Sequence, residues 1–192
     1  MNYLAIDVGG TYVKYGLIDR SGNFIKFDKT PTQQNLHDFL NQIYDLIEPV
    51  KHEIKGIGIS LPGKIDTEEG VVYFGGSLQF LHKVPLKATI EKRFGIRCEL
   101  SNDGKAAALA ELWLGNLKNV TNGVAIILGT GVGGGIIINS ELYQGSHFQA
   151  GELSFMMSNC KVNSYKDMTG FSHSAVRFVK SASHLLGLED EN

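Results

Sequence analysis

Short runs in which hydrophobic residues alternate with other residues occur near the N-terminus and again in the second half of the chain. Alternation with a period of two is typical of β-strands that bury one face. Thr30-Pro31 is expected to break the third strand, because proline lacks the N–H that a strand ladder uses. In chain order, the expected strands cover residues 3–6, 13–18, 23–27, 54–59, 98–100, 123–128, 136–138 and 142–143.

Four other segments carry apolar residues at helical spacing. Their boundaries have local signals: Asn35 precedes the first helix and Pro49 ends it, Pro85 lies in the first turn of the second, and Gly95 and Gly187 follow the second and fourth. The expected helices cover residues 36–47, 85–94, 103–114 and 172–186. The order β-β-β-α-β-α-β-α is followed by a restart with three strands, which predicts an α/β protein whose second half begins as the first did.

Composition narrows the class of protein. The chain has 192 residues, of which 43% are hydrophobic and 20% charged, as in ordinary globular proteins. A net charge of -2 argues against nucleic acid as the main partner. No apolar run approaches the roughly 20 residues of a membrane span, and no signal-peptide pattern is present, so a cytoplasmic location without membrane association is expected.

Two glycine-rich turns are the main candidates for chemistry, and the first follows the first strand. Gly9 and Gly10 have no Cβ to block the approach of a ligand to the backbone, so this turn is suited to an anion. The carboxylate of Asp7 is suited to a metal ion or its water, and Thr11 has a hydroxyl to donate. A plain β-hairpin with a glycine turn is the alternative.

The second turn covers residues 129–135 and has five glycines in seven residues. Gly129, Gly131 and Gly134 match a dinucleotide-binding fingerprint as a string, but a strand follows them where that fingerprint requires a helix. The sequence around Gly63-Lys64 falls short of a P-loop for similar reasons: Ile65 stands where Ser or Thr is needed. A strand–turn–strand glycine loop that contacts phosphate is therefore preferred to a bare turn.

Asn102-Asp103 lies where a strand ends and a helix begins. Either residue can cap the helix, which is worth about 1 kcal/mol. Capping by Asn102 leaves Asp103 free to act as a general base towards a substrate hydroxyl. Because the glycine turns are present, the interpretation of Asp103 as a general base is preferred to the interpretation of this pair as a helix cap alone. Glu152 has only a weak local signal and by itself is interpreted as a solvated charge.

Five motifs follow one another along the chain: Asp7-x-Gly9-Gly10-Thr11-x-x-Lys14, Leu61-Pro62-Gly63, Asn102-Asp103, the seven residues 129–135, and Ala150-Gly151-Glu152. In this order and rough spacing, from Met1 to about Leu153, the chain resembles the ROK family of sugar kinases and sugar-responsive repressors. The resemblance implies an actin-like, ribonuclease H-like fold of two domains that close over a sugar. The expected domains are a complete N-terminal one at residues 1–119 and an incomplete second one at residues 120–192.

The resemblance also implies roles for individual residues. ATP with Mg²⁺ is the expected cofactor, and Asp7 is expected to hold the magnesium through water or phosphate. The residues expected to bind ATP phosphates are Asp7, Gly9, Gly10, Thr11, Lys14, Gly129, Thr130, Gly131, Gly133 and Gly134. The residues expected to bind the sugar are Pro62, Gly63, Asn102, Asp103 and Glu152, with Asp103 as the base at the 6-hydroxyl.

Three departures from the family pattern refine these expectations. Leu153-Ser154-Phe155 replaces the Gly-His that precedes a zinc knuckle in many members, and only Cys160 lies downstream, so no zinc is expected and the β-glucoside kinase branch is favoured. The first strand starts at Tyr3, so we expect no DNA-binding module. Family members run to roughly 300 residues, so the adenine-binding part is expected to be absent.

The sequence thus predicts an ATP-dependent sugar kinase that phosphorylates a hexose or glycoside. The rival hypothesis is a fragment or truncated paralogue that binds sugar without catalysing transfer, and the missing adenine-binding part favours it for this polypeptide. An unfinished second domain would expose apolar strand edges. Exposed edges of this kind encourage self-association, for example as a homodimer.

Overall fold

The computed structural model describes residues 1–158 and 164–188. The chain divides into two compact units, Met1–Ala106 and Ala107–Asn192. The division falls inside the helix α3 (Asp103–Leu114), whereas the sequence places the domain boundary between residues 119 and 120. Each unit is described by itself below.

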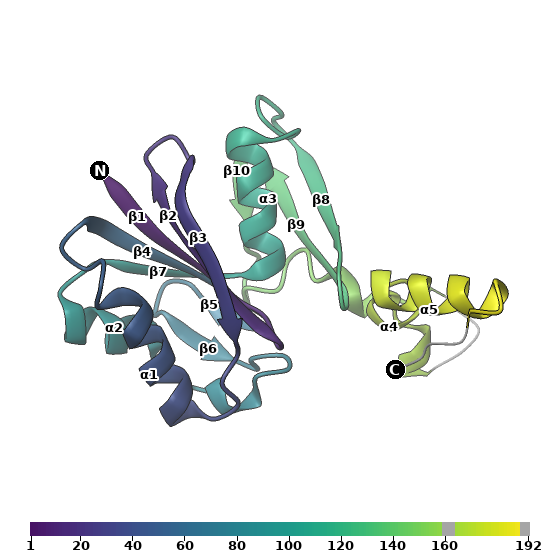
Figure 1. The fold of residues 1–192 in the computed structure, drawn as a ribbon. Coiled ribbons are helices and arrows are strands. Elements are labelled where there is room, and N and C mark those ends of the chain that lie inside the picture. The colour runs from purple at the N-terminus through teal and green to yellow at the C-terminus, as the bar shows by residue number, and fades with distance from the viewer. Residues whose placement is uncertain (159–163, 189–192) are drawn as a thin grey trace. The chain divides into compact units, whose positions relative to one another are not determined.

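The first unit is built on a five-stranded sheet in the order β3-β2-β1-β4-β7 (Figure 1). The strands β1, β2 and β3 are antiparallel neighbours, whereas β4 and β7 run parallel to β1. The strands are β1 (Asn2–Val8), β2 (Tyr12–Asp19), β3 (Phe24–Pro31), β4 (Ile54–Leu61) and β7 (Cys98–Asn102). The carboxyl ends of β1, β4 and β7 therefore meet at one edge of the sheet, where ligands of open α/β sheets bind.

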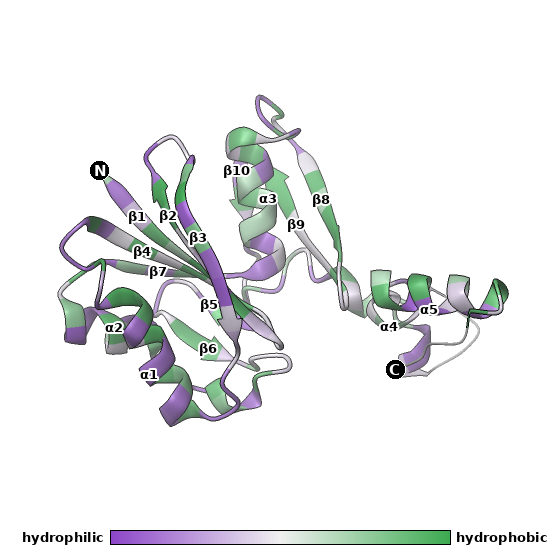
Figure 2. Cartoon of the chain, in the orientation of Figure 1, coloured by the Kyte–Doolittle hydropathy of each residue, from purple (hydrophilic) through white to green (hydrophobic). Residues whose placement is uncertain are grey.

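Two helices, α1 (Leu36–Ile47) and α2 (Leu86–Phe94), pack on one face of this sheet (Figure 1). The side chain of Asn35 accepts a hydrogen bond from the Asp38 N–H, which confirms it as the N-cap of α1. Gly95 ends α2 in the left-handed region at φ 65°. In α1 the hydrophobic and hydrophilic residues lie on different sides, as an amphipathic helix requires (Figure 2).

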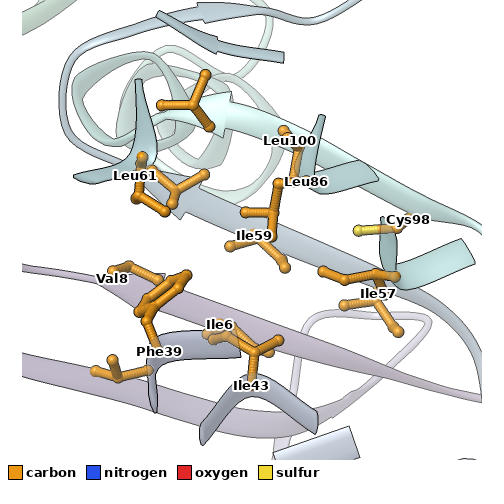
Figure 3. Packing of buried hydrophobic residues seen from close by; sticks show 14 of the residues in the cluster. Ile6, Val8, Phe39, Ile43, Ile57, Ile59, Leu61, Leu86, Cys98 and Leu100 are labelled. Atoms are coloured by element: carbon orange, nitrogen blue, oxygen red, sulfur yellow. The ribbon is translucent and has the colours of Figure 1, made fainter. Parts of the chain in front are cut away.

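The hydrophobic core of the first unit lies between this sheet face and the two helices. Figure 3 shows Phe39 and Ile43 of α1 packed against side chains of β1 and β4, with Leu86 of α2 beside Ile59. Alternate residues of β1 and β4 are buried, so their other side chains lie on the opposite face. That second face carries Asp7.

A small excursion follows β4. It contains β5 (Lys64–Asp66), β6 (Val71–Tyr73) and the short 3₁₀ helix η1 (Gln79–Leu81). The two strands pair as a hairpin whose tip is residues 67–70, as the sequence predicts.

The second unit contains a three-stranded antiparallel sheet in the order β10-β9-β8. Its strands are β8 (Gly123–Leu128), β9 (Val132–Ile138) and β10 (Glu141–Tyr143). Short helical elements follow: η2 (Leu153–Phe155), η3 (Tyr165–Asp167), α4 (Thr169–Ser172) and α5 (Ala175–Leu185). No helix in the described residues combines the length and apolar character needed to cross a bilayer.

Three expectations about elements are wrong. β3 continues through Thr30 to Pro31, which is tolerated because β3 is an edge strand and need not donate there. Strand β9 starts at Val132 rather than at residue 136, so much of the glycine run lies in a strand. The last expected helix, residues 172–186, begins later, at Ala175, because Ser174 caps α5 by accepting a hydrogen bond from the Arg177 N–H, and Ser172 belongs to the preceding α4.

Candidate functional site

The turn between β1 and β2 has its carbonyl oxygens fixed by a neighbouring segment. Thr32 Oγ1 donates to the Gly9 carbonyl at 2.7 Å, and Gln34 Nε2 donates to the Gly10 carbonyl at 3.2 Å. Within the described residues, the N–H groups of Gly10 and Thr11 donate to no protein acceptor. The turn therefore offers two backbone donors to an anion.

Each glycine of this turn has a distinct reason to be glycine. A Cβ on Gly9 would lie 3.1 Å from the Tyr12 carbonyl oxygen. The Gly9 N–H donates to that same oxygen at 3.0 Å and closes the turn, so it is not one of the donors left for a ligand. A Cβ on Gly10 would lie 2.7 Å from Ser77 Oγ. The loop that contains Ser77 thus packs directly against the turn.

The carboxylate of Asp7 is oriented by residues of two neighbouring strands. Ser60 Oγ donates to Asp7 Oδ1 at 2.7 Å, and Lys14 Nζ lies 3.8 Å from Asp7 Oδ2. Strand register explains both contacts, because Lys14 and Ser60 are the residues paired with Asp7 in β2 and β4. The next strand continues this row with Ser101, which is paired with Ser60.

Asn102 joins the start of α3 to the loop after β4. Its Oδ1 accepts a hydrogen bond from the Lys105 N–H at 3.1 Å, and its Nδ2 donates to the Gly63 carbonyl at 3.0 Å. The residue is only 7% exposed. The expected capping role is confirmed. Both polar groups of the Asn102 side chain form hydrogen bonds within the protein, and these connect the start of α3 to the loop after β4.

Asp103 begins α3 and is exposed to solvent. Its Oδ1 accepts a hydrogen bond from the Gly104 N–H at 2.8 Å. Part of the residue is open to solvent, but surrounding protein atoms displace water from around the carboxyl group. This loss of hydration, together with the negative charge of Asp7, raises the pKa of the Asp103 carboxyl above its ordinary value. A raised pKa makes this carboxylate a stronger proton acceptor. Asp7 lies near the carboxyl end of β1 and Asp103 follows the parallel strand β7, so both acids lie at the same edge of the sheet.

In the second unit, the turn between β8 and β9 is short. The Gly129 N–H donates to the Gly131 carbonyl at 3.0 Å across Thr130, and the Gly129 carbonyl accepts from the Ala175 N–H at 3.0 Å. The first residue of α5 therefore anchors the turn. This leaves Gly129, Thr130 and Gly131 at the tip, whereas Gly133 and Gly134 lie in β9.

Gly134 has a packing reason to be glycine. A Cβ there would lie 2.7 Å from Leu153 Cδ1 and 3.0 Å from the carbonyl oxygens of Ala125 and Gly151. Gly151 in turn has φ 80°, and its Cβ would lie 3.0 Å from Gly135 Cα. Close packing of two backbones thus holds residues 151–153 against β9, which fixes the backbone of the neighbouring Glu152.

The acidic groups of the first unit suit magnesium better than zinc. Mg²⁺ commonly takes one or two carboxylates and keeps several waters, and Asp7 offers an oriented, half-exposed carboxylate. Within the described residues, no three or more His, Cys, Asp or Glu side chains gather as a metal site. Cys160, which the zinc expectation invoked, lies outside the described residues.

Sequence reasoning missed several residues that shape these sites. Thr32, Gln34 and Ser60 fix the first turn and the Asp7 carboxylate from positions far away in the chain. Lys105 is a buried lysine, 1% exposed, two residues after Asp103. Ser60 lies near the end of β4 and Thr32 directly follows β3, but a polar residue at such a position does not indicate which distant group it contacts.

The curated proteins that are similar to this chain include sugar kinases. It is 30% identical over 159 residues to a β-glucoside kinase of Klebsiella pneumoniae, covering 83% of this chain and 54% of that protein. It is 35% identical over 147 residues to a glucokinase of Streptomyces coelicolor, covering 76% of this chain and 46% of that protein. The chain therefore spans about half the length of these relatives.

Solved structures show the same architecture. A ROK family glucokinase from Streptomyces griseus, in complex with glucose and AMPPNP, matches with a TM-score of 0.85 at 25% identity, over 100% of this chain and 63% of that one. A putative N-acetylmannosamine kinase from Listeria monocytogenes matches with a TM-score of 0.87 at 28% identity, over 100% of this chain and 67% of that one. The fold is the expected actin-like ATPase fold. The ROK family model matches residues 3–166, and the chain belongs to the ROK family.

Proposed function

We propose that this chain carries the sugar-binding and catalytic residues of an ATP-dependent sugar kinase, which transfers the γ-phosphoryl group to the 6-hydroxyl of a hexose or glycoside. Asp103 is the general base. The observation that carries the proposal is the position of two acids at one edge of the sheet: Asp7 near the carboxyl end of β1, hydrogen-bonded by Ser60, and Asp103 directly after the parallel strand β7. Phosphoryl transfer needs positioning and charge stabilisation more than covalent chemistry.

In this proposal the two acids have different tasks. Asp103 accepts the proton of the substrate hydroxyl as its oxygen attacks phosphorus. Asp7 would hold the magnesium ion that accompanies ATP, and the metal would neutralise phosphate charge. Phosphates are bound by the backbone N–H groups of Gly10 and Thr11 and by the Lys14 side chain. Phosphates are also bound by the second turn at residues 129–131, which Gly133 and Gly134 follow in β9. Pro62, Gly63, Asn102 and Glu152 shape the sugar site.

The second candidate is a protein that binds sugar without transferring phosphate. The chain spans 46% of the Streptomyces coelicolor glucokinase, so phosphoryl transfer by these 192 residues needs a test separate from sugar binding. The two candidates predict the same sugar binding and differ in ADP release.

The Asp103→Asn variant tests the catalytic assignment. ADP release is measured over a panel of sugars, and sugar binding is measured by calorimetry. If the wild-type chain turns over, the variant should lose roughly 10²-fold or more of its rate while binding sugar nearly as well, because the amide cannot accept the proton. Unchanged turnover would refute the base. Sugar binding by the wild-type chain without ADP release would support the second candidate.

A further inference from the structure

Two lysines face each other across the outer strands of the five-stranded sheet. Lys14 of β2 and Lys29 of β3 are directly paired in the antiparallel register. Side chains of directly paired residues lie on the same face of a sheet, with Cβ atoms about 4.5–5.5 Å apart. Like charges in such a pair repel each other, so an anion that binds between them is stabilised.

The two lysines lie on the sheet face that carries Asp7. Lys14 Nζ lies 3.8 Å from Asp7 Oδ2, and at least half of each of these side chains is exposed to solvent. Among the described residues, no carboxylate oxygen lies within 4 Å of Lys29 Nζ. One carboxylate therefore accompanies two ammonium groups, and the group carries a net positive charge.

The Lys29 ammonium is held beside the first glycine turn. Its Nζ lies 4.7 Å from the centroid of the Tyr12 ring, and Tyr12 directly follows Thr11. The segment after β3 is also bound to the turn, because the Thr32 N–H donates to the Thr11 carbonyl at 3.0 Å and Thr32 Oγ1 donates to the Gly9 carbonyl. A cation–π contact positions an ammonium group and leaves its hydrogen-bond donors for another partner.

These groups form a row that begins at the turn. The open N–H groups of Gly10 and Thr11 come first, and the ammonium groups of Lys14 and Lys29 follow. Lys14 is two residues beyond Tyr12, which is roughly 7 Å along the strand. Such a row suits an anion whose charge is spread along a chain, such as linked phosphates, better than a single small anion.

Resting on the proposed function, we infer that Lys29 is a further phosphate-binding residue, which together with Lys14 binds the oligophosphate chain of the phosphoryl donor. The ligand chemistry is a phosphoanhydride chain, which either a nucleoside triphosphate or inorganic polyphosphate supplies. Lys29 binds the donor and takes no part in proton transfer, which the proposed function assigns to Asp103.

The test measures the binding of ATP and of tripolyphosphate, each with Mg²⁺, to the full chain by calorimetry. Lys29→Gln should weaken the binding of both ligands roughly three- to tenfold, the range for one charge contact near solvent. The affinity of this variant should also depend less steeply on sodium chloride, because one cation fewer faces the ligand. Lys29→Arg keeps the positive charge and should retain most of the affinity.

Lys26→Gln is the matched control, because Lys26 is exposed on the same strand. It lies three positions before Lys29, and side chains an odd number of positions apart in a strand lie on opposite faces. Both Gln variants have the same net charge, so their comparison removes the effect of the total charge of the protein. Lys26→Gln should leave both affinities nearly unchanged.

The outcomes separate the two hypotheses. Wild-type chain that binds neither ligand overturns the phosphate-binding part of the proposed function and the inference with it. Wild-type binding with equal affinities in Lys29→Gln and Lys26→Gln, or a loss confined to ATP when both ligands bind, overturns the role of Lys29 alone. A selective loss in Lys29→Gln on both ligands supports it, and so does a selective loss on tripolyphosphate when the wild-type chain binds only that ligand.

Discussion

Single hydrogen bonds between distant residues decide how the acids of the first unit can act. Asp7 was evident from the sequence, but its partner Ser60 is 53 positions further along the chain. Only the register of β1 and β4 brings them together, and short-range patterns do not encode register between parallel strands that are far apart in the chain.

Ser60→Ala tests whether this hydrogen bond positions Asp7 for a metal. We expect the affinity for Mn²⁺ in the presence of nucleotide, measured by electron paramagnetic resonance, to fall about tenfold, as is usual when an outer partner of a metal ligand is lost. Ser101→Ala is the control in the same row of the sheet, because Ser101 Oγ is buried and has no hydrogen-bond partner within the described residues. An equal effect of both variants would contradict a specific role for Ser60.

The raised pKa of Asp103 has a consequence for stability. Folded protein then holds this proton more tightly than unfolded protein, so stability falls as pH rises through the raised pKa. Asp103→Asn should therefore raise the melting temperature at pH 7, and the gain should shrink as pH is lowered towards the ordinary Asp pKa, 3.8. Melting curves at several pH values measure this. A gain that is independent of pH would mean that ionisation of Asp103 is not the cause.

At the scale of elements, several boundaries follow from local signals. Asn35 caps α1 and Gly95 ends α2, as their residue types suggest. The glycine run at residues 129–135 led to a wrong start for the strand that follows, because glycine also serves close packing inside a strand. Gly134 is needed where residues 151–153 cross β9, and that crossing is a tertiary contact.

Gly63→Ala tests how strictly the loop after β4 is specified. Both the positive φ of Gly63 (93°) and its close approach to the Phe74 carbonyl oppose a Cβ, so we expect a loss of about 3 kcal/mol or more in the free energy of unfolding, measured in urea. Gly58→Ala is the control in β4, because its Cβ would meet nothing within 4 Å. That change should be neutral or stabilise by up to roughly 1 kcal/mol. Similar losses in both variants would mean that the loop conformation is not the constraint.

At the scale of the whole molecule, the two units differ in how much apolar surface they cover. The first unit has a contiguous core between its sheet and its helices. In the second, one face of β8 exposes Val124, Ile126 and Leu128 by 52–64%, and Figure 2 shows this strand as largely hydrophobic. Exposed apolar patches of this kind mark surfaces that another structure covers.

We therefore expect the 192-residue chain to self-associate through β8. Ile126→Lys should lower both the binding of the dye ANS and the weight-average mass in analytical ultracentrifugation at high concentration, because a charge opposes burial of this face. Ile25→Lys is the control, with similar exposure (57%) on β3 of the first unit. A mass that is independent of concentration would rule out self-association.

The sequence by itself determined the family, the order of elements, the two glycine turns and the acids Asp7 and Asp103, because motifs, periodicity and caps are local and survive in a linear string. Tertiary structure alone decided that Ser60 orients Asp7, that Asn102 ties Gly63 to α3, that Gly134 makes room for a crossing backbone, and that Lys29 faces Lys14 beside the first turn. Each of these depends on strand register or on the approach of two backbones, and such contacts join residues whose separation along the chain is unrelated to their distance in space.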